Sequence, residues 1–103
     1  MADFKLLLVD DEVEFLEPMA ARLARRRVSC TTAQNGVEAL KILGAEHFDC
    51  AVVDVKMPEM DGLELLRRMR WNHPDVPVIL LSRNRMRGPY VLKMRTMWES
   101  TLW

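Results

Sequence analysis

The stretch Asp54–Gly62, with the sequence DVKMPEMDG, decides the fold because an apolar run leads straight into it. Residues 50–53 are Cys-Ala-Val-Val, and a short apolar run bounded by turn residues is typical of a buried parallel strand. Open α/β sheets bind their ligands at the carboxyl ends of such strands. The stretch therefore predicts an α/β fold with Asp54 at a ligand site. The alternative role for Asp54 is to cap the following turn.

Two further strand-like runs end in polar side chains. Residues 5–9, KLLLV, lead into Asp10 and Asp11, and residues 76–81, VPVILL, lead into Ser82. Parallel strands bring their carboxyl ends to one edge, so we expect the three aspartates to lie together there. Like charges at short range repel one another unless a cation lies among them. Oxygen ligands without His or Cys suit Mg²⁺, so the pattern predicts a magnesium site.

Composition places the chain among single-domain globular proteins. It has 103 residues, half of them hydrophobic, and a formal net charge of zero, which gives no general attraction to nucleic acid or to membranes. No leader and no membrane span is predicted, so a cytoplasmic protein is expected.

Cys30 and Cys50 lack metal-type spacing and are expected to be buried, reduced thiols.

Helical and strand-like patterns alternate along the chain. A first helix is expected over about residues 12–26, with a kink or late start at Pro18, followed by a strand over residues 28–33. A second apolar stripe ends at Gly44, and a third follows Gly62 and stops before Pro74. Such alternation predicts a parallel sheet with right-handed crossovers.

The run Arg25-Arg26-Arg27 has two interpretations. Basic runs occur in nucleic-acid binding patches, but three cations at the end of a helix also complement its dipole and remain solvated. The second interpretation is preferred here.

These motifs resemble those of the response-regulator receiver domain of two-component signalling. The matching residues are Asp10-Asp11, the loop D-x-x-M-P-x-M-D-G from Asp54 to Gly62, and Ser82. The resemblance implies a doubly wound, flavodoxin-like parallel sheet. It covers Phe4 to Ser82, within a receiver-like core of residues 1–82 with four clear strands, and leaves residues 83–103 as an atypical C-terminal segment of the same domain.

The segment after Ser82 is too short for the helix, strand and helix that a receiver places there. Tyr90-Val91-Leu92-Lys93 matches the family's fifth strand, which makes Lys93 the candidate phosphate-pairing lysine. A parallel strand, however, needs a crossover of a dozen or more residues, and only residues 83–89 are available. A helix starting near Gly88 and Pro89 is therefore favoured over a strand. A third alternative is that the segment is foreign to the fold, because its composition, rich in Arg, Met and Trp, differs from that of the preceding residues.

The resemblance further implies a phosphoacceptor. Asp54 would accept a phosphoryl group from a sensor histidine kinase or a phosphotransfer protein, with Mg²⁺ held by Asp10, Asp11, Asp54 and the backbone carbonyl of Lys56. Ser82 would hydrogen-bond the phosphoryl group. Such a domain is not an enzyme, although it can assist its own phosphorylation and dephosphorylation. Direct nucleic-acid or membrane binding is not expected. A homodimer through residues 83–103 is expected.

Two rival functions are compatible with parts of the pattern. The irregular segment after Ser82 is compatible with a protein-interaction module that keeps the fold without phosphorylation. A Mg²⁺ phosphatase of the haloacid-dehalogenase type also uses a nucleophilic Asp, but such enzymes have a second acid two residues later, where this chain has Lys56.

Overall fold

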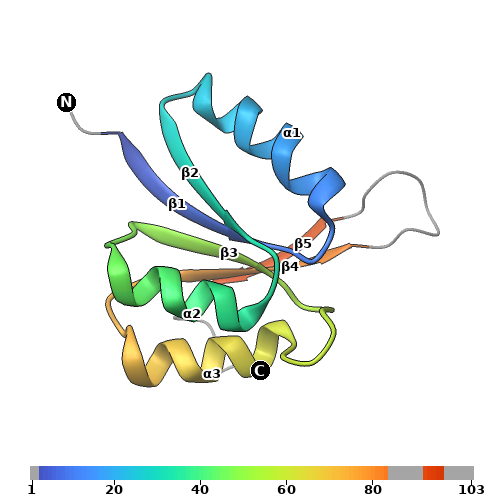
Figure 1. The fold of residues 1–103 in the computed structure, drawn as a ribbon, viewed down its shortest axis with the longest axis vertical. Coiled ribbons are helices and arrows are strands. Elements are labelled where there is room, and N and C mark those ends of the chain that lie inside the picture. The colour runs from blue at the N-terminus through green and yellow to red at the C-terminus, as the bar shows by residue number, and fades with distance from the viewer. Residues whose placement is uncertain (1–2, 84–91, 97–103) are drawn as a thin grey trace.

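The computed structural model describes residues 3–83 and 92–96 and arranges them as one twisted sheet with helices on both faces (Figure 1). The strand order is β2-β1-β3-β4-β5. The strands are β1 (Phe4–Val9), β2 (Val28–Ala33), β3 (Cys50–Asp54), β4 (Val78–Arg83) and β5 (Leu92–Thr96). The helices are α1 (Val13–Ala24), α2 (Gly36–Ala45) and α3 (Gly62–Asn72).

The first four strands are parallel, as the alternating pattern predicts. Leu6 of β1 is in register with Cys30 of β2 and with Cys50 of β3, and Asp54 at the end of β3 is in register with Leu81 of β4. This confirms the receiver-like parallel sheet of four strands with three helices. The carboxyl ends of β1 and β3 lie side by side because these two strands are neighbours.

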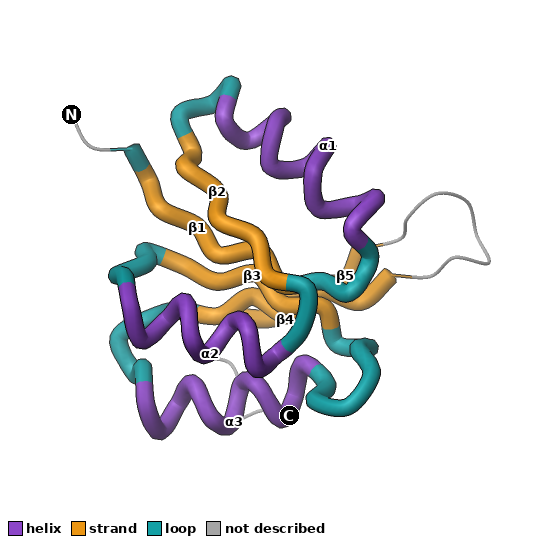
Figure 2. Tube along the Cα trace, in the orientation of Figure 1, coloured by secondary structure: helices purple, strands orange, loops and turns teal. Residues whose placement is uncertain are grey.

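The two faces of the sheet have separate apolar cores. Helices α2 and α3 lie on one face and α1 on the other, as Figure 2 shows. The first core joins the strands to α2 and α3 through the buried side chains of Leu7, Val9, Leu43, Val53, Leu65, Met69 and Val78. The second joins Leu6, Leu8 and Leu81 to Phe15 and Leu16 of α1. Side chains alternate between faces along each strand, so a run such as Leu6-Leu7-Leu8-Val9 supplies both cores.

The helix boundaries follow from local capping chemistry. The side chain of Asn35 accepts a hydrogen bond from Glu38 N at 2.8 Å, and that of Asp61 accepts one from Glu64 N at 2.9 Å, so each caps the start of its helix. Of the two alternatives predicted at Pro18, a kink or a late start, the late start is wrong, since α1 begins at Val13 with Pro18 inside it. Among the described helices, none has the length and apolar character needed to cross a bilayer.

The preference for a helix after Ser82 is wrong for residues 92–96, which form strand β5. The objection to a strand assumed that it would be parallel and would need a long crossover. Strand β5 instead runs antiparallel to β4, with Ile79 in register with Thr96 and Arg83 with Leu92. An antiparallel neighbour needs only a turn between the two strands. The rest of the predicted helix, residues 88–91 and 97–103, lies outside the described residues.

Both cysteines are free thiols. Cys50 is buried and Cys30 is half-buried, and burial raises the pKa of each thiol above its ordinary value. Both are therefore protonated at neutral pH and poor nucleophiles, as expected for cysteines that serve packing.

Candidate functional site

Asp10 and Asp11 lie directly beyond β1. Asp10 is completely buried, and its backbone N–H donates to Ala33 O at 3.0 Å, which extends the pairing of β1 with β2 by one residue. Its Oδ1 accepts a hydrogen bond from Glu12 N at 2.9 Å, which fixes the orientation of the carboxylate. Burial of a carboxylate is costly unless it is compensated. The end of β1 thus holds an acidic side chain in a defined position.

Asp54 is the last residue of β3 and is only 4% exposed. Its Oδ1 accepts a hydrogen bond from Lys56 N at 3.4 Å, and the next residue, Val55, donates its N–H to Leu81 O at 3.0 Å. The backbone of β4 therefore holds Val55, the first residue of the loop after Asp54, in a fixed position. The side chain of Lys56 itself is exposed.

The three aspartates meet at the carboxyl edge of the sheet. Asp10, Asp11 and Asp54 each offer a carboxylate oxygen, and these oxygens lie within 4.8 Å of one another. Asp11 Oδ1 is buried and has no hydrogen-bond partner among the described residues. Three negative charges at this spacing repel one another. The donor set consists of carboxylates alone and includes the buried Oδ1 of Asp11. Such a set fits a hard divalent cation such as Mg²⁺.

The loop after Asp54 folds back onto the sheet and closes at Gly62. The Gly62 N–H donates to Val55 O at 2.9 Å. A Cβ at position 62 would lie 2.8 Å from Val55 Cα and closer still to the carbonyl oxygen of Asp54, so only glycine allows this approach. Met57 is buried and anchors the middle of the loop in the core beside α3. The sequence motif includes Gly62, but the steric role of this glycine was not predicted. The sequence feature that could have indicated it is a glycine directly after the capping residue Asp61.

Ser82 and Lys93 are brought opposite each other by the pairing of β4 with β5. Ser82 follows Leu81, the register partner of Asp54, and lies inside β4 rather than after it. Paired residues in an antiparallel ladder lie about 5 Å apart at Cα. The backbone thus places Lys93 near the edge that holds Asp54, although the chain reaches that position by a route different from the expected crossover.

Comparison with known proteins gives a consistent assignment. Residues 6–95 match the family model of the response regulator receiver domain. The chain is 39% identical over 77 residues to the transcriptional regulatory protein GlrR of Escherichia coli K12, which covers 75% of this chain and 17% of that protein. It is 37% identical over 78 residues to the response regulator MprA of Mycobacterium sp. KMS, covering 76% of this chain and 34% of the relative. The chain thus spans only a sixth to a third of the length of these relatives.

Solved structures agree with this assignment. The response regulator TrrA of Thermotoga maritima, in complex with Mg²⁺-BeF, superposes with a TM-score of 0.73 at 32% identity, covering 82% of this chain and 75% of that one. A Francisella receiver domain superposes with a TM-score of 0.74 at 31% identity, covering 79% and 67% of the two chains. With its sequence match from residue 6 to residue 95 and its shared fold, the chain belongs to the response regulator receiver domain family.

Proposed function

We propose that the chain is the phosphoacceptor of a cytoplasmic two-component relay, taking a phosphoryl group onto Asp54 with the help of Mg²⁺. The observation that carries the proposal is the approach of three carboxylates to within 4.8 Å, with Asp54 at the end of β3. Receiver domains of response regulators receive phosphoryl groups from histidine kinases and are signalling modules. The partner would therefore be a sensor histidine kinase or a phosphotransfer protein. The test is labelling by a small phosphodonor, described in the Discussion.

The chemical step is an in-line displacement at phosphorus. A carboxylate oxygen of Asp54 attacks the phosphorus, a bond forms between them, and the bond from phosphorus to the donor histidine nitrogen breaks with its electron pair leaving on the histidine. A bound Mg²⁺ would neutralise charge on the equatorial phosphoryl oxygens. Asp10, Asp11, Asp54 and the Lys56 carbonyl would be the protein ligands of the ion. The hydrogen bond from Lys56 N to Asp54 Oδ1 holds the acceptor carboxylate in place for the attack.

Ser82 and Lys93 are proposed to bind the transferred group. Their register across β4 and β5 supports this, because a hydroxyl and an ammonium group would then come from neighbouring backbone positions. The ammonium would pair with a phosphoryl oxygen and the hydroxyl would donate a hydrogen bond to another. Movement of these two residues on phosphorylation would alter the β4–β5 surface, as in other switches driven by a charged group.

Mg²⁺ is expected to raise the melting temperature of the wild type, because it binds the folded state and relieves repulsion among the carboxylates. At a hundredfold excess over the dissociation constant, the stabilisation is about 2.7 kcal/mol. Asp11→Ala should lose most of it, since Asp11 supplies a buried oxygen that has no hydrogen-bond partner among the described residues. Glu38→Ala, which removes a half-buried carboxylate outside the cluster, should keep the full response. Differential scanning calorimetry with and without Mg²⁺ measures both, and an unchanged response in Asp11→Ala would remove Asp11 from the site.

The rival function is an interaction module that is never phosphorylated, and it predicts that a small phosphodonor leaves the chain unlabelled. Such a module has no need for three converging carboxylates, and their mutual repulsion is a cost that phosphoryl transfer with a cation would explain. The phosphatase alternative remains disfavoured, because Lys56 stands where that class has its second acid.

Self-association through residues 83–103 stays a prediction. Residues 84–91 and 97–103 lie outside the described residues, and β5 is an edge strand of the sheet. The segment is rich in Met and Trp, which are typical interface anchors. Light scattering is expected to show that the double variant Trp98→Ser/Trp103→Ser has a smaller mass at high micromolar concentration than the wild type. Equal masses would show that these tryptophans do not mediate association.

A further inference from the structure

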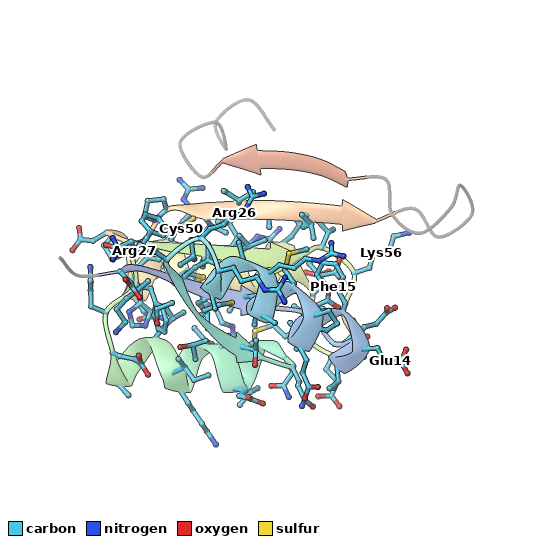
Figure 3. All side chains as sticks on the ribbon, turned by 90° about the horizontal axis from the view of Figure 1, so that it is seen from above. Glu14, Phe15, Arg26, Arg27, Cys50 and Lys56 are labelled. Atoms are coloured by element: carbon cyan, nitrogen blue, oxygen red, sulfur yellow. The ribbon has the colours of Figure 1, made fainter. Side chains whose placement is uncertain are left out.

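Helix α1 separates its exposed charges along its length. The acidic residues Glu14 and Glu17 lie in its first half, whereas Arg22 lies in its last turn and Arg25 is its C-cap residue. Figure 3 shows the two ends, with Glu14 at one and Arg26 at the other. All five side chains are exposed. The outer surface of α1 is therefore acidic at one end and basic at the other.

These charges are not neutralised within the helix. A salt bridge along a helix joins residues three or four positions apart, and neither Glu14 nor Glu17 has an arginine at those positions. Among residues 3–81, whose side chains the structure describes, the ion pairs that form involve none of the four charged residues of the outer face, Glu14, Glu17, Arg22 and Arg25. Helix α3, by contrast, has such a pair between Glu64 and Arg68 at 3.9 Å. The acidic and basic ends of α1 are therefore available to partners.

A single row of residues runs down the middle of this outer face. Positions 14, 18, 21 and 25 follow one another at intervals of four, three and four, which keeps them on one side of a helix. They are Glu14, Pro18, Ala21 and Arg25, and all four are exposed. The buried residues Phe15 and Leu16 point instead to the core beneath α1. The row therefore has a charge at each end and two small side chains in the middle.

The row is complementary to itself when a second copy runs in the opposite direction. The pair Glu14 and Arg25 and the pair Pro18 and Ala21 are centred on the same point of the helix, between residues 19 and 20. A two-fold axis through that point places Glu14 opposite Arg25 of the other copy and Pro18 opposite its Ala21. Glu17 and Arg22 flank the row near its two ends.

We propose that α1 is a docking surface for α1 of a second copy of this chain, in an antiparallel pair about a two-fold axis. At each end two carboxylates then face two guanidinium groups, and the small residues in the middle allow the helix backbones to approach closely. An isologous contact of this kind closes on itself and gives a dimer rather than a filament. The surface is separate from residues 83–103 and does not depend on phosphorylation of Asp54.

The helix dipole gives a different explanation for the same charges. Acidic residues in the first turn and basic ones at the other end stabilise a single helix, which accounts for Glu14, Arg22 and the C-cap residue Arg25. The effect is confined to the terminal turns, and it does not account for Glu17 or for the uncharged Pro18 and Ala21 between the ends. The two explanations predict different results, since the dipole acts on the stability of one chain and docking acts on its association.

The contact is expected to be weak. The helix has 12 residues, so it is about 18 Å long, and one helix pair of that length buries less surface than a stable dimer does. Exposed ion pairs are screened by salt. Association is therefore expected at high micromolar concentration and low ionic strength, with at least about a tenfold weaker affinity in 0.5 M than in 0.05 M sodium chloride.

Two charge-reversal variants test the proposal in the full chain, with Trp98→Ser/Trp103→Ser as the parent that serves as the wild type here, so that association through these tryptophans does not contribute. Glu14→Arg/Glu17→Arg makes the outer face of α1 entirely basic, and Arg22→Glu/Arg25→Glu makes it entirely acidic. Each variant alone should remain monomeric in sedimentation velocity, because like charges would meet at both ends. An equimolar mixture should form a heterodimer, because an all-acidic helix then faces an all-basic one. Arg67→Glu/Arg70→Glu, a reversal of two exposed charges on α3, should associate as the wild type does.

The outcomes separate the possibilities. A salt-sensitive wild-type dimer that both variants lose and their mixture restores supports the α1 pair, and restoration also shows that both variants are folded. A wild type that stays monomeric at low salt overturns the proposal. So does association that survives in either variant alone when Trp98 and Trp103 are already replaced, and so does a mixture of folded variants that fails to associate. If the variants unfold, insensitivity of the wild-type dimer to salt overturns the proposal by itself.

Discussion

Asp54→Asn is expected to accept no phosphoryl group from a small phosphodonor with Mg²⁺, whereas the wild type gains the mass of one. An amide oxygen is not a nucleophile toward phosphorus under these conditions, and the neutral side chain also removes one ligand charge from the metal site. The change is nearly isosteric at a position that is 4% exposed, so the packing around β3 should be kept. Intact mass spectrometry, with and without Mg²⁺, measures the labelling. The wild-type label should be labile, as an acyl phosphate is.

Asp61→Asn is the matched control for this experiment. It makes the same chemical change in the same loop, and asparagine can still cap α3 by accepting from Glu64 N as Asp61 does at 2.9 Å. This variant should be labelled as fully as the wild type. Labelling that persists in Asp54→Asn, or a label that is stable to mild alkali, would assign the acceptor to another residue and refute the proposed function.

Gly62→Ala is expected to lower the free energy of unfolding by about 2–3 kcal/mol, because the added methyl group meets backbone atoms that cannot move aside cheaply. The new Cβ would lie 2.8 Å from Val55 Cα and closer to the carbonyl of Asp54. Relief requires the end of β3 or the start of α3 to shift, and a shift at Asp54 would also disturb the carboxylate cluster. We therefore expect weaker Mg²⁺ binding together with lower stability, measured by urea unfolding and by Mg²⁺ titration.

Gly44→Ala provides the contrast within the same chain. Gly44 lies inside α2, and a Cβ there would meet nothing within 4 Å. Alanine should stabilise the helix by up to about 1 kcal/mol, since glycine is a poor helix former. Changes of opposite sign in the free energy of unfolding would confirm that the loss in Gly62→Ala comes from the close approach at Gly62. A general destabilising effect of replacing glycine by alanine would lower stability in both variants. Equal or negligible effects would show that the loop adjusts without cost.

The acidic site and the parallel core could be predicted because both depend on patterns that are local in the sequence. Apolar runs such as residues 6–9 favour burial, and a carboxylate directly after such a run is expected at the edge of the sheet. Two such runs in neighbouring parallel strands then bring Asp10, Asp11 and Asp54 together. Resemblance to a known family added the doubly wound, flavodoxin-like topology and the expected role of Asp54.

The direction of β5 could not be predicted from the same information. The residues Leu92–Thr96 mix apolar and basic side chains, and Val91, Met94 and Trp98 also fit a helical period. What decides between strand and helix is the free edge of β4, whose backbone groups accept a partner in either direction. This is a tertiary effect that no local pattern contains. The close approach at Gly62 was missed for a similar reason, since it depends on where the loop returns to β3.

The antiparallel attachment of β5 has a consequence for how the domain forms. In the parallel part of the sheet each strand must find a partner far along the chain, as Leu6 of β1 does with Cys50 of β3, whereas β5 pairs with the strand directly before it in sequence. Pairing that is close in sequence loses less chain entropy and forms faster than distant pairing. Because β5 has β4 as its neighbour and ends the sheet, it can also separate from the sheet without breaking any ladder of the parallel core. The edge that holds Asp54 is thus built on contacts between residues far apart in the sequence, whereas Lys93 lies on a strand that pairs with the strand directly before it.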